Sequence, residues 1–126
     1  MKRLLFSVLI LSALTGAAHA ERRSGSGCVV PERITLPTHQ RAADMPANRL
    51  VGWIYDTNRS AAVLKSGRCT CKTFFPPWDA AVAEFESLFG GLSVGQATPG
   101  WARDYGKKSR TLLDEARTMC IQQGVF

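Results

Sequence analysis

The clearest repeat of apolar side chains lies between residues 76 and 91. Pro76-Pro77 and Gly90-Gly91 bound a stretch in which large apolar residues return after three or four positions, the spacing of one helix face. These residues are Trp78, Val82, Phe85 and Phe89, with Ala81 and Leu88 beside them. Proline is favoured at the first positions of a helix, and glycine is favoured just beyond its end. The pattern therefore predicts an amphipathic helix, with an apolar face that another part of the chain must cover.

A second periodic stretch spans residues 46–66. Its apolar positions share one helical face and comprise Leu50, Trp53, Ile54, Thr57, Ala61 and Leu64. Asp44 is placed as an N-cap, Pro46 lies near the first helical position, and Ser66-Gly67 is a typical stop. Residues 50–55 alone would also suit a strand that leads into a turn, because they are rich in aromatic and β-branched side chains. We favour the helix because the spacing persists over the longer window.

The third predicted helix has Thr98 as its N-cap and Pro99 at its first position, and it ends near Gln123. Its buried line is expected to consist of Trp101, Tyr105, Leu112, Ala116 and Met119. Cys120 flanks this line. Gly106 interrupts the helix, at a cost of about 1 kcal/mol relative to alanine.

Residues 21–44 show no periodicity. Pro31 and Pro37 stand there among scattered single apolar residues, a composition that predicts an irregular arm. The expected fold is therefore mainly α, with an irregular N-terminal arm over residues 21–44 and a small helical domain over residues 45–126. We expect this domain to be a disulfide-stapled bundle of about three amphipathic helices. Its predicted core comprises Trp53, Ile54, Leu64, Trp78, Val82, Phe85, Phe89, Trp101, Leu112 and Met119.

The first twenty residues have the pattern of a secretory signal peptide. Lys2 and Arg3 precede a short apolar run, and Ala18-His19-Ala20 supplies the small residues that a signal peptidase requires before its cut. A membrane anchor needs about 20 apolar residues, and this run is shorter and interrupted by hydroxyl side chains. We therefore expect residues 1–20 to be removed by cleavage after Ala20, which would leave a periplasmic or secreted protein without a transmembrane segment.

All four cysteines lie beyond this segment, at Cys28, Cys69, Cys71 and Cys120. In an exported chain of this size, two disulfides are the default. Four cysteines allow three pairings, and the pairing that joins Cys69 to Cys71 closes a very small, strained ring. The other two pairings both tie the Cys69-Thr70-Cys71 loop to the arm through Cys28 and to the last helix through Cys120. Each long-range bridge would contribute on the order of 2–4 kcal/mol of stability.

The charge balance points to a surface that could bind anions. The chain has 16 Lys and Arg against 10 Asp and Glu, and the net charge of +6 falls by two when the signal peptide leaves with Lys2 and Arg3. On the third predicted helix, four basic residues share a face away from the apolar line: Arg103, Lys107, Arg110 and Arg117. This face is a candidate site for an anionic surface or partner. Alternatively, it is a solvated face with weak pairs to Asp114. Export argues against a nucleic-acid partner.

Catalytic patterns are weak. At 126 residues the chain is too short for a TIM barrel or a dinucleotide-binding fold. His39 is the only histidine outside the predicted signal peptide, and no His-Glu-x-x-His motif occurs, so we expect neither a Ser-His-Asp triad nor a zinc hydrolase site. Glu84 could act with Asp79 or Asp104 as a pair of carboxylates, but it is predicted on an exposed helical face. Residues 90–100 lack the Gly-Lys-Ser/Thr ending of a phosphate-binding loop and suit a hinge, which is a second candidate surface. We therefore expect no catalytic residue, cofactor or metal.

The combined features favour an exported, non-enzymatic binding protein. In size, signal peptide and cysteines the chain resembles the small accessory proteins of bacterial cell-envelope assemblies, such as conjugative or type IV secretion systems. That resemblance implies another envelope or secreted protein as the partner. Two alternatives remain at this point: a thiol–disulfide redox protein that uses Cys69 and Cys71, and a secreted effector or inhibitor.

Overall fold

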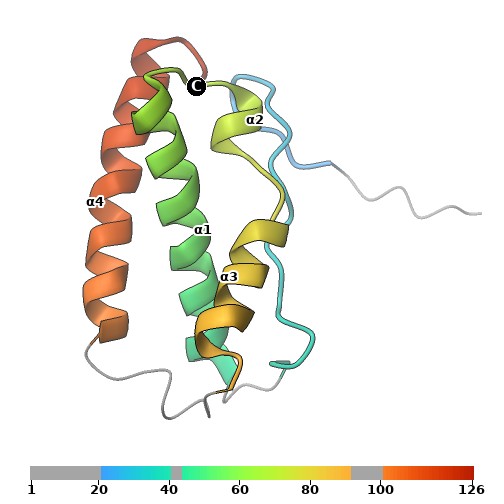
Figure 1. Cartoon of the computed structure of the whole chain (residues 1–126). Coiled ribbons are helices and arrows are strands. Elements are labelled where there is room, and N and C mark those ends of the chain that lie inside the picture. Colours follow the sequence, from blue (N-terminus) through green and yellow to red (C-terminus); the bar gives the residue numbers. More distant parts are fainter. Residues whose placement is uncertain (1–20, 41–43, 92–100) are drawn as a thin grey trace, which may run out of the picture.

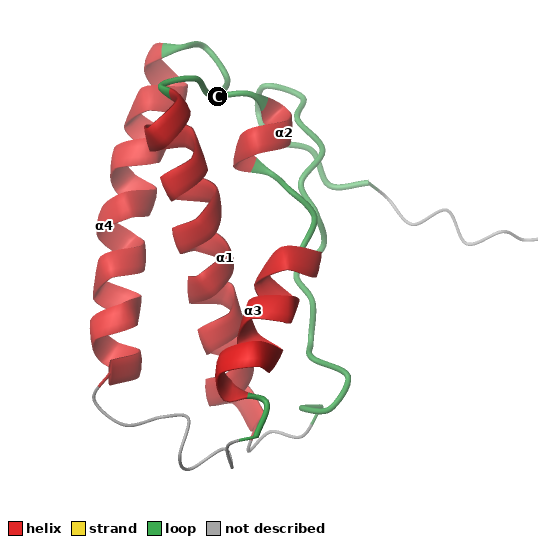
Figure 2. Cartoon of the chain, viewed as in Figure 1, coloured by secondary structure: helices red, strands yellow, loops and turns green. Residues whose placement is uncertain are grey.

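The structure is a computed structural model, and it describes residues 21–40, 44–91 and 101–126, with only the backbone of Trp101 and Ala102. Within these residues it contains four helices: α1 (Met45–Ser66), α2 (Cys71–Phe74), α3 (Asp79–Phe89) and α4 (Trp101–Gln122). No strand occurs there, apart from an isolated bridge between Arg23 and Val29 (Figure 2). The prediction of a mainly α, disulfide-stapled bundle with three long helices is confirmed. The predicted signal peptide with its cleavage after Ala20, and the expected helix start at Thr98 and Pro99, lie outside the described residues.

Helix α1 is the central element of the bundle. It contacts α2, α3 and α4. Helix α3 runs antiparallel to α1, and α4 runs parallel to it, while the arm passes from α2 along α3 to the start of α1 (Figure 1). Because α1 has neighbours on most sides, its buried residues do not form the single apolar face that we expected. Ala61 of that face is exposed, whereas Val51 and Tyr55, which lie off it, are buried.

The helix ends follow the expected signals with small differences. Asp44 occupies the N-cap position of α1, but its side chain forms no capping hydrogen bond with the helix. Gly67 ends α1 with φ of 66°, and its N–H donates to the carbonyl of Val63 at 2.9 Å. Helix α3 begins at Asp79, after Pro76-Pro77, with Trp78 as N-cap. The alternative of a strand over residues 50–55 was wrong, since they lie inside α1.

The core is divided into two clusters. The first joins the arm, the first half of α1 and α3, and comprises Leu36, Ala47, Leu50, Val51, Ile54, Tyr55, Ala81 and Phe85. The second joins the end of α1, α2 and the end of α4, and comprises Val63, Cys69, Phe74, Ala116 and Cys120. Of the predicted core, Ile54 and Phe85 are fully buried. Partly buried are Trp53, Leu64, Trp78, Val82, Phe89, Leu112 and Met119, and the side chain of Trp101 lies outside the described part.

Helix α4 packs through a line that shares Ala116 with the predicted one and otherwise differs from it. Its fully buried positions are Gly106, Ser109, Ala116 and Cys120, whereas Tyr105, Leu112 and Met119 are only half-buried beside them. Small residues at these positions let α4 lie close to α1. A Cβ at Gly106 would be 2.7 Å from the indole ring of Trp53. Gly106 is therefore a site of close helix contact rather than merely a weak point in the helix.

Candidate functional site

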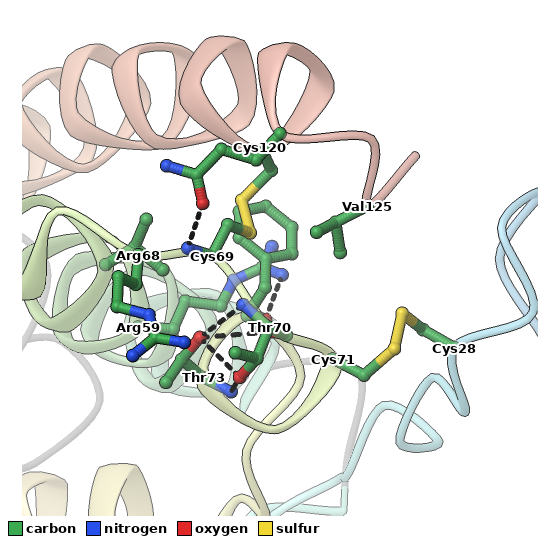
Figure 3. Close-up of a disulfide and its surroundings, with 12 residues drawn as sticks. Cys28, Arg59, Arg68, Cys69, Thr70, Cys71, Thr73, Cys120 and Val125 are labelled. Carbon is green, nitrogen blue, oxygen red and sulfur yellow. Dashed lines mark hydrogen bonds between the residues drawn. A yellow bond between two sulfur atoms is a disulfide. The ribbon is translucent and has the colours of Figure 1, made fainter.

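The four cysteines form two long-range bridges that leave one short segment in different directions. Cys71 is bonded to Cys28 of the arm, and Cys69 is bonded to Cys120 of α4, with Cα–Cα distances of 5.3 and 5.1 Å (Figure 3). This result decides between the two pairings that the sequence left open. Because Cys69 and Cys71 are not bonded to each other, the pairing is that of structural bridges and gives no support to an exchange site at this segment.

Local hydrogen bonds explain why the two neighbouring cysteines face different partners. Thr70 and Thr73 form a reciprocal capping box that starts α2: the hydroxyl of Thr70 accepts from the N–H of Thr73 at 3.1 Å, and the hydroxyl of Thr73 accepts from the N–H of Thr70 at 2.9 Å. Gln123 holds the residues before α2 against α4, because its side chain accepts from the N–H of Cys69 at 2.7 Å and donates to the carbonyl of Gly67 at 3.0 Å. Cys69 thus points to α4 and Cys71 to the arm.

The arm is fixed at both ends. Cys28 is bonded to α2 at one end, and Leu36 is buried at the other, where its N–H donates to the side-chain oxygen of Asn48 at 2.8 Å. The side-chain amide of Asn48 also donates to the carbonyl of His39 at 2.7 Å. The ring of His39 packs edge-on against Phe85, with 5.7 Å between the ring centroids. These contacts hold the arm against the first half of α1.

Between the arm and α1 lies a hollow of about 370 Å³ that is rich in arginine. Arg22 and Arg33 come from the arm, and Arg49 and Arg59 come from α1. Asp56 is the one acidic residue among the lining residues. Trp53, Tyr55, Phe75 and Trp78 supply aromatic walls. We call this hollow the arginine groove.

Arg59 and Asp56 form the inner end of the arginine groove. The Arg59 side chain is only 11% exposed, and its Nη2 and Nε atoms lie 2.7 and 2.9 Å from Oδ1 of Asp56. Its Nη1 donates to the carbonyl of Phe74 at 2.9 Å, and its guanidinium carbon lies 4.4 Å from the centroid of the Phe74 ring. Arg59 therefore connects α1 to α2, and its charge is balanced by Asp56.

The other three arginines of the groove are exposed, and no described carboxylate compensates them. Arg22, Arg33 and Arg49 all lie at the surface, and none forms an ion pair with any residue that the structure describes. A guanidinium is always charged and presents five donors in a planar fork. The groove thus combines three free positive charges on one concave surface, which suits an anionic ligand.

The aromatic wall is held rigidly. The rings of Tyr55 and Trp78 stack with 3.8 Å between their centroids, and the Tyr55 hydroxyl donates to the carbonyl of Pro76 at 2.8 Å. Burial raises the pKa of Tyr55 above its usual value of 10.0, the positive charge of Arg59 lowers it, and the negative charge of Asp56 raises it further. Tyr55 therefore remains a neutral hydrogen-bond donor at physiological pH, and the wall behind the arginines keeps its shape.

The groove continues along the arm into a second hollow of about 510 Å³. Arg33 and Arg49 line both hollows and so mark the point where they meet. Gly52 of α1 makes room for Arg33, because a Cβ there would lie 3.3 Å from the terminal Nη2 atom of that arginine. Together the two hollows follow the arm from the side of Arg22 to Gln40.

The basic residues predicted on the last helix lie outside the arginine groove. Arg103, Lys107, Arg110 and Arg117 are all exposed on α4. The expected weak pairs of Asp114 with Arg110 and Arg117 are absent from the ion pairs of the described residues, which join Glu21 to Arg23 and Asp56 to Arg59. These four residues thus remain a second candidate surface. Of the predicted hinge, residues 92–100 lie outside the described part of the chain.

Glu84 does not lie on an exposed face as expected. It is partly buried, and its carboxylate accepts hydrogen bonds from Asn58 of α1 at 2.7 Å and from Tyr105 of α4 at 3.5 Å. Burial, followed by the negative charge of Glu84 and this hydrogen bond, raises the pKa of Tyr105. Glu84 therefore links three helices, which is a structural role.

Sequence reasoning missed the arginine groove because its residues form no local pattern. Comparison of the chain with protein-family models, with curated proteins and with solved structures finds no match. Among the helices that the structure describes, none has the length and apolar composition needed to cross a membrane. The groove is the strongest candidate site in the described part of the molecule, because there two distant segments of the chain bring uncompensated charges together.

Proposed function

We propose that this chain is an exported, non-enzymatic binding protein whose arginine groove holds an acidic segment of another envelope or secreted protein. The observation that carries the proposal is the concave cluster of Arg22, Arg33 and Arg49, which no carboxylate among the described residues compensates. Guanidinium groups form two parallel hydrogen bonds with a carboxylate, and arginine and tryptophan are enriched at the centres of protein interfaces.

The groove favours binding over catalysis. Asp56 is its one carboxylate, and Arg59 already occupies that carboxylate with two short contacts. A general base needs a free acceptor within reach of the proton that it removes. The lining offers cations and aromatic rings instead, which are groups that position a ligand.

The setting supports an extracytoplasmic role. Two long-range disulfides persist in oxidising compartments, and the first twenty residues have the pattern of a secretory signal. An accessory component of a bacterial cell-envelope assembly, for example a conjugative or type IV secretion system, would meet acidic partners in such a compartment. A secreted effector or inhibitor would use the same groove.

The test is a titration of the purified mature protein with poly-L-glutamate. Two of the three tryptophans, Trp53 and Trp78, line the groove, so their fluorescence reports its occupancy. The groove variant replaces three residues: Arg22→Gln, Arg33→Gln and Arg49→Gln. The matched control removes the same charge from α4: Arg103→Gln, Lys107→Gln and Arg110→Gln. All six residues replaced in these two variants are exposed, so both variants should fold.

We expect the groove variant to bind at least about tenfold more weakly, a loss of roughly 1.4 kcal/mol. The α4 control should bind within about threefold of the parent, because it lowers the net charge equally without changing the groove. Equal losses in both variants would show that binding follows net charge alone. A loss confined to the control would transfer the site to the basic face of α4.

A further inference from the structure

We infer that the ligand of the arginine groove is an extended acidic peptide whose backbone pairs with residues 32–35 of the arm. This inference rests on the proposed function and specifies the form of the acidic ligand. Three features carry it: the conformation of the arm, the free backbone groups along it, and the positions of the arginines.

The arm is extended where it passes the groove. Ile34 packs on the first core cluster, and Leu36 is fully buried. Arg33, which precedes Ile34, and Thr35, which lies between Ile34 and Leu36, are both exposed. This alternation has the period of two that an extended strand produces. Pro31 also favours an extended conformation for the residue before it. Figure 1 shows the arm as a trace without helix or strand that runs beside α3, from the level of α2 to the level of the start of α1.

The backbone of residues 32–35 has no hydrogen-bond partner in the described part of the chain. The N–H of Val30 donates to the carbonyl of Arg22 at 2.8 Å, and the N–H of Leu36 donates to Asn48. Between these anchors, the N–H and carbonyl groups of residues 32–35 form no hydrogen bond with any residue that the structure describes. Residues 32–35 thus form a single extended segment with an open edge, the feature that binds peptides by strand addition.

The charges select an acidic peptide. Successive side chains of an added strand point to opposite sides, so every second one would face the groove. Arg33 and Arg49 stand at the junction of the two hollows, and Arg22 lines the first. Glu32, an acidic residue of the arm, lines neither hollow. A peptide with acidic residues at alternate positions therefore matches both the edge and the guanidinium groups. An anionic polysaccharide would match only the guanidinium groups, because it has no peptide groups to pair with the arm.

The experiment compares designed peptides of equal charge on the mature protein. The parent peptide has seven residues that alternate glutamate and threonine, beginning and ending with glutamate. Its isomer groups all the glutamates at one end. Two further versions carry N-methyl groups, one on the glutamate amides and the other on the threonine amides. Since an added strand bonds to its neighbour through every second N–H, only one of these versions blocks pairing. An oligogalacturonate of equal charge serves as the polysaccharide.

We expect the parent peptide to bind at least about tenfold more tightly than the isomer and the oligogalacturonate, and one methylated version to lose about tenfold in affinity. The inference is overturned if both methylated versions bind like the parent, or if the isomer or the oligogalacturonate does. The proposed function would survive such a result if the groove variant described above still bound the acidic ligands more weakly than the parent protein does. If that variant binds every ligand as well as the parent protein does, the proposed function itself fails.

Discussion

At the scale of single residues, two glycines of the bundle show how the same residue type serves different purposes. Gly52 lies next to Nη2 of Arg33, an atom at the far end of a flexible side chain. Gly106 instead lies against the ring of Trp53. The sequence shows both simply as glycines within predicted helices. Helix propensity assigns the same cost of about 1 kcal/mol to each, so only their neighbours distinguish them.

We predict opposite effects of alanine at these two positions. Gly52→Ala should raise the free energy of unfolding by about 0.5–1 kcal/mol, because the helix gains and the Arg33 terminus can move by a few tenths of an ångström. Gly106→Ala should lower it by about 1–3 kcal/mol, because the added methyl group overlaps a partly buried indole ring. Urea denaturation measures both changes. Midpoints that shift in the same direction for the two variants would contradict this account of the α1–α4 contact.

At the scale of elements, the positions of the long helices could be predicted from the sequence. Spacing of apolar residues, prolines and glycines predicted the three long helices, because those signals are local. The faces that they bury were less predictable. On α4, the buried line runs through Gly106, Ser109 and Cys120, which a count of large apolar side chains overlooks. Helix α1 contacts α2, α3 and α4, so it buries residues on more than the single predicted apolar face. Helix α2 is a single turn whose capping box consists of two threonines and gives no periodic signal.

The two disulfides should have separable effects at this scale. Cys69 and Cys120 lie in the second core cluster, so Cys69→Ser with Cys120→Ser should lower the free energy of unfolding by about 2–5 kcal/mol. Cys28→Ser with Cys71→Ser releases the Cys28 end of the arm, near Arg22, while the contacts of α1 with α3 and α4 remain. This second variant should keep its helical circular dichroism and lose at least about tenfold in poly-L-glutamate affinity. If the Cys28→Ser, Cys71→Ser variant keeps both its helical circular dichroism and its affinity for poly-L-glutamate, the groove does not depend on the Cys28–Cys71 disulfide.

At the scale of the whole molecule, the candidate site depends on which distant segments meet. Arg22 and Arg59 are separated by most of the arm and about two-thirds of α1. They line one hollow because Cys28 is bonded to Cys71 and Leu36 is buried in the core cluster that includes α1. From the sequence, the Cys28–Cys71 pairing was one of two equal alternatives, and the path of an aperiodic arm has no local signal. The basic face of α4 could be predicted from the sequence because all four of its residues lie on one helix.

The central claim is that an acidic ligand binds where the arm meets α1. Amide hydrogen exchange of the protein, with and without saturating poly-L-glutamate, tests it most directly because it locates the ligand along the chain. We predict slower exchange in residues 32–35, whose N–H groups are free in the described structure, with little change over residues 103–117 of α4. Protection confined to residues 103–117, with exchange in the arm unchanged, would contradict the account.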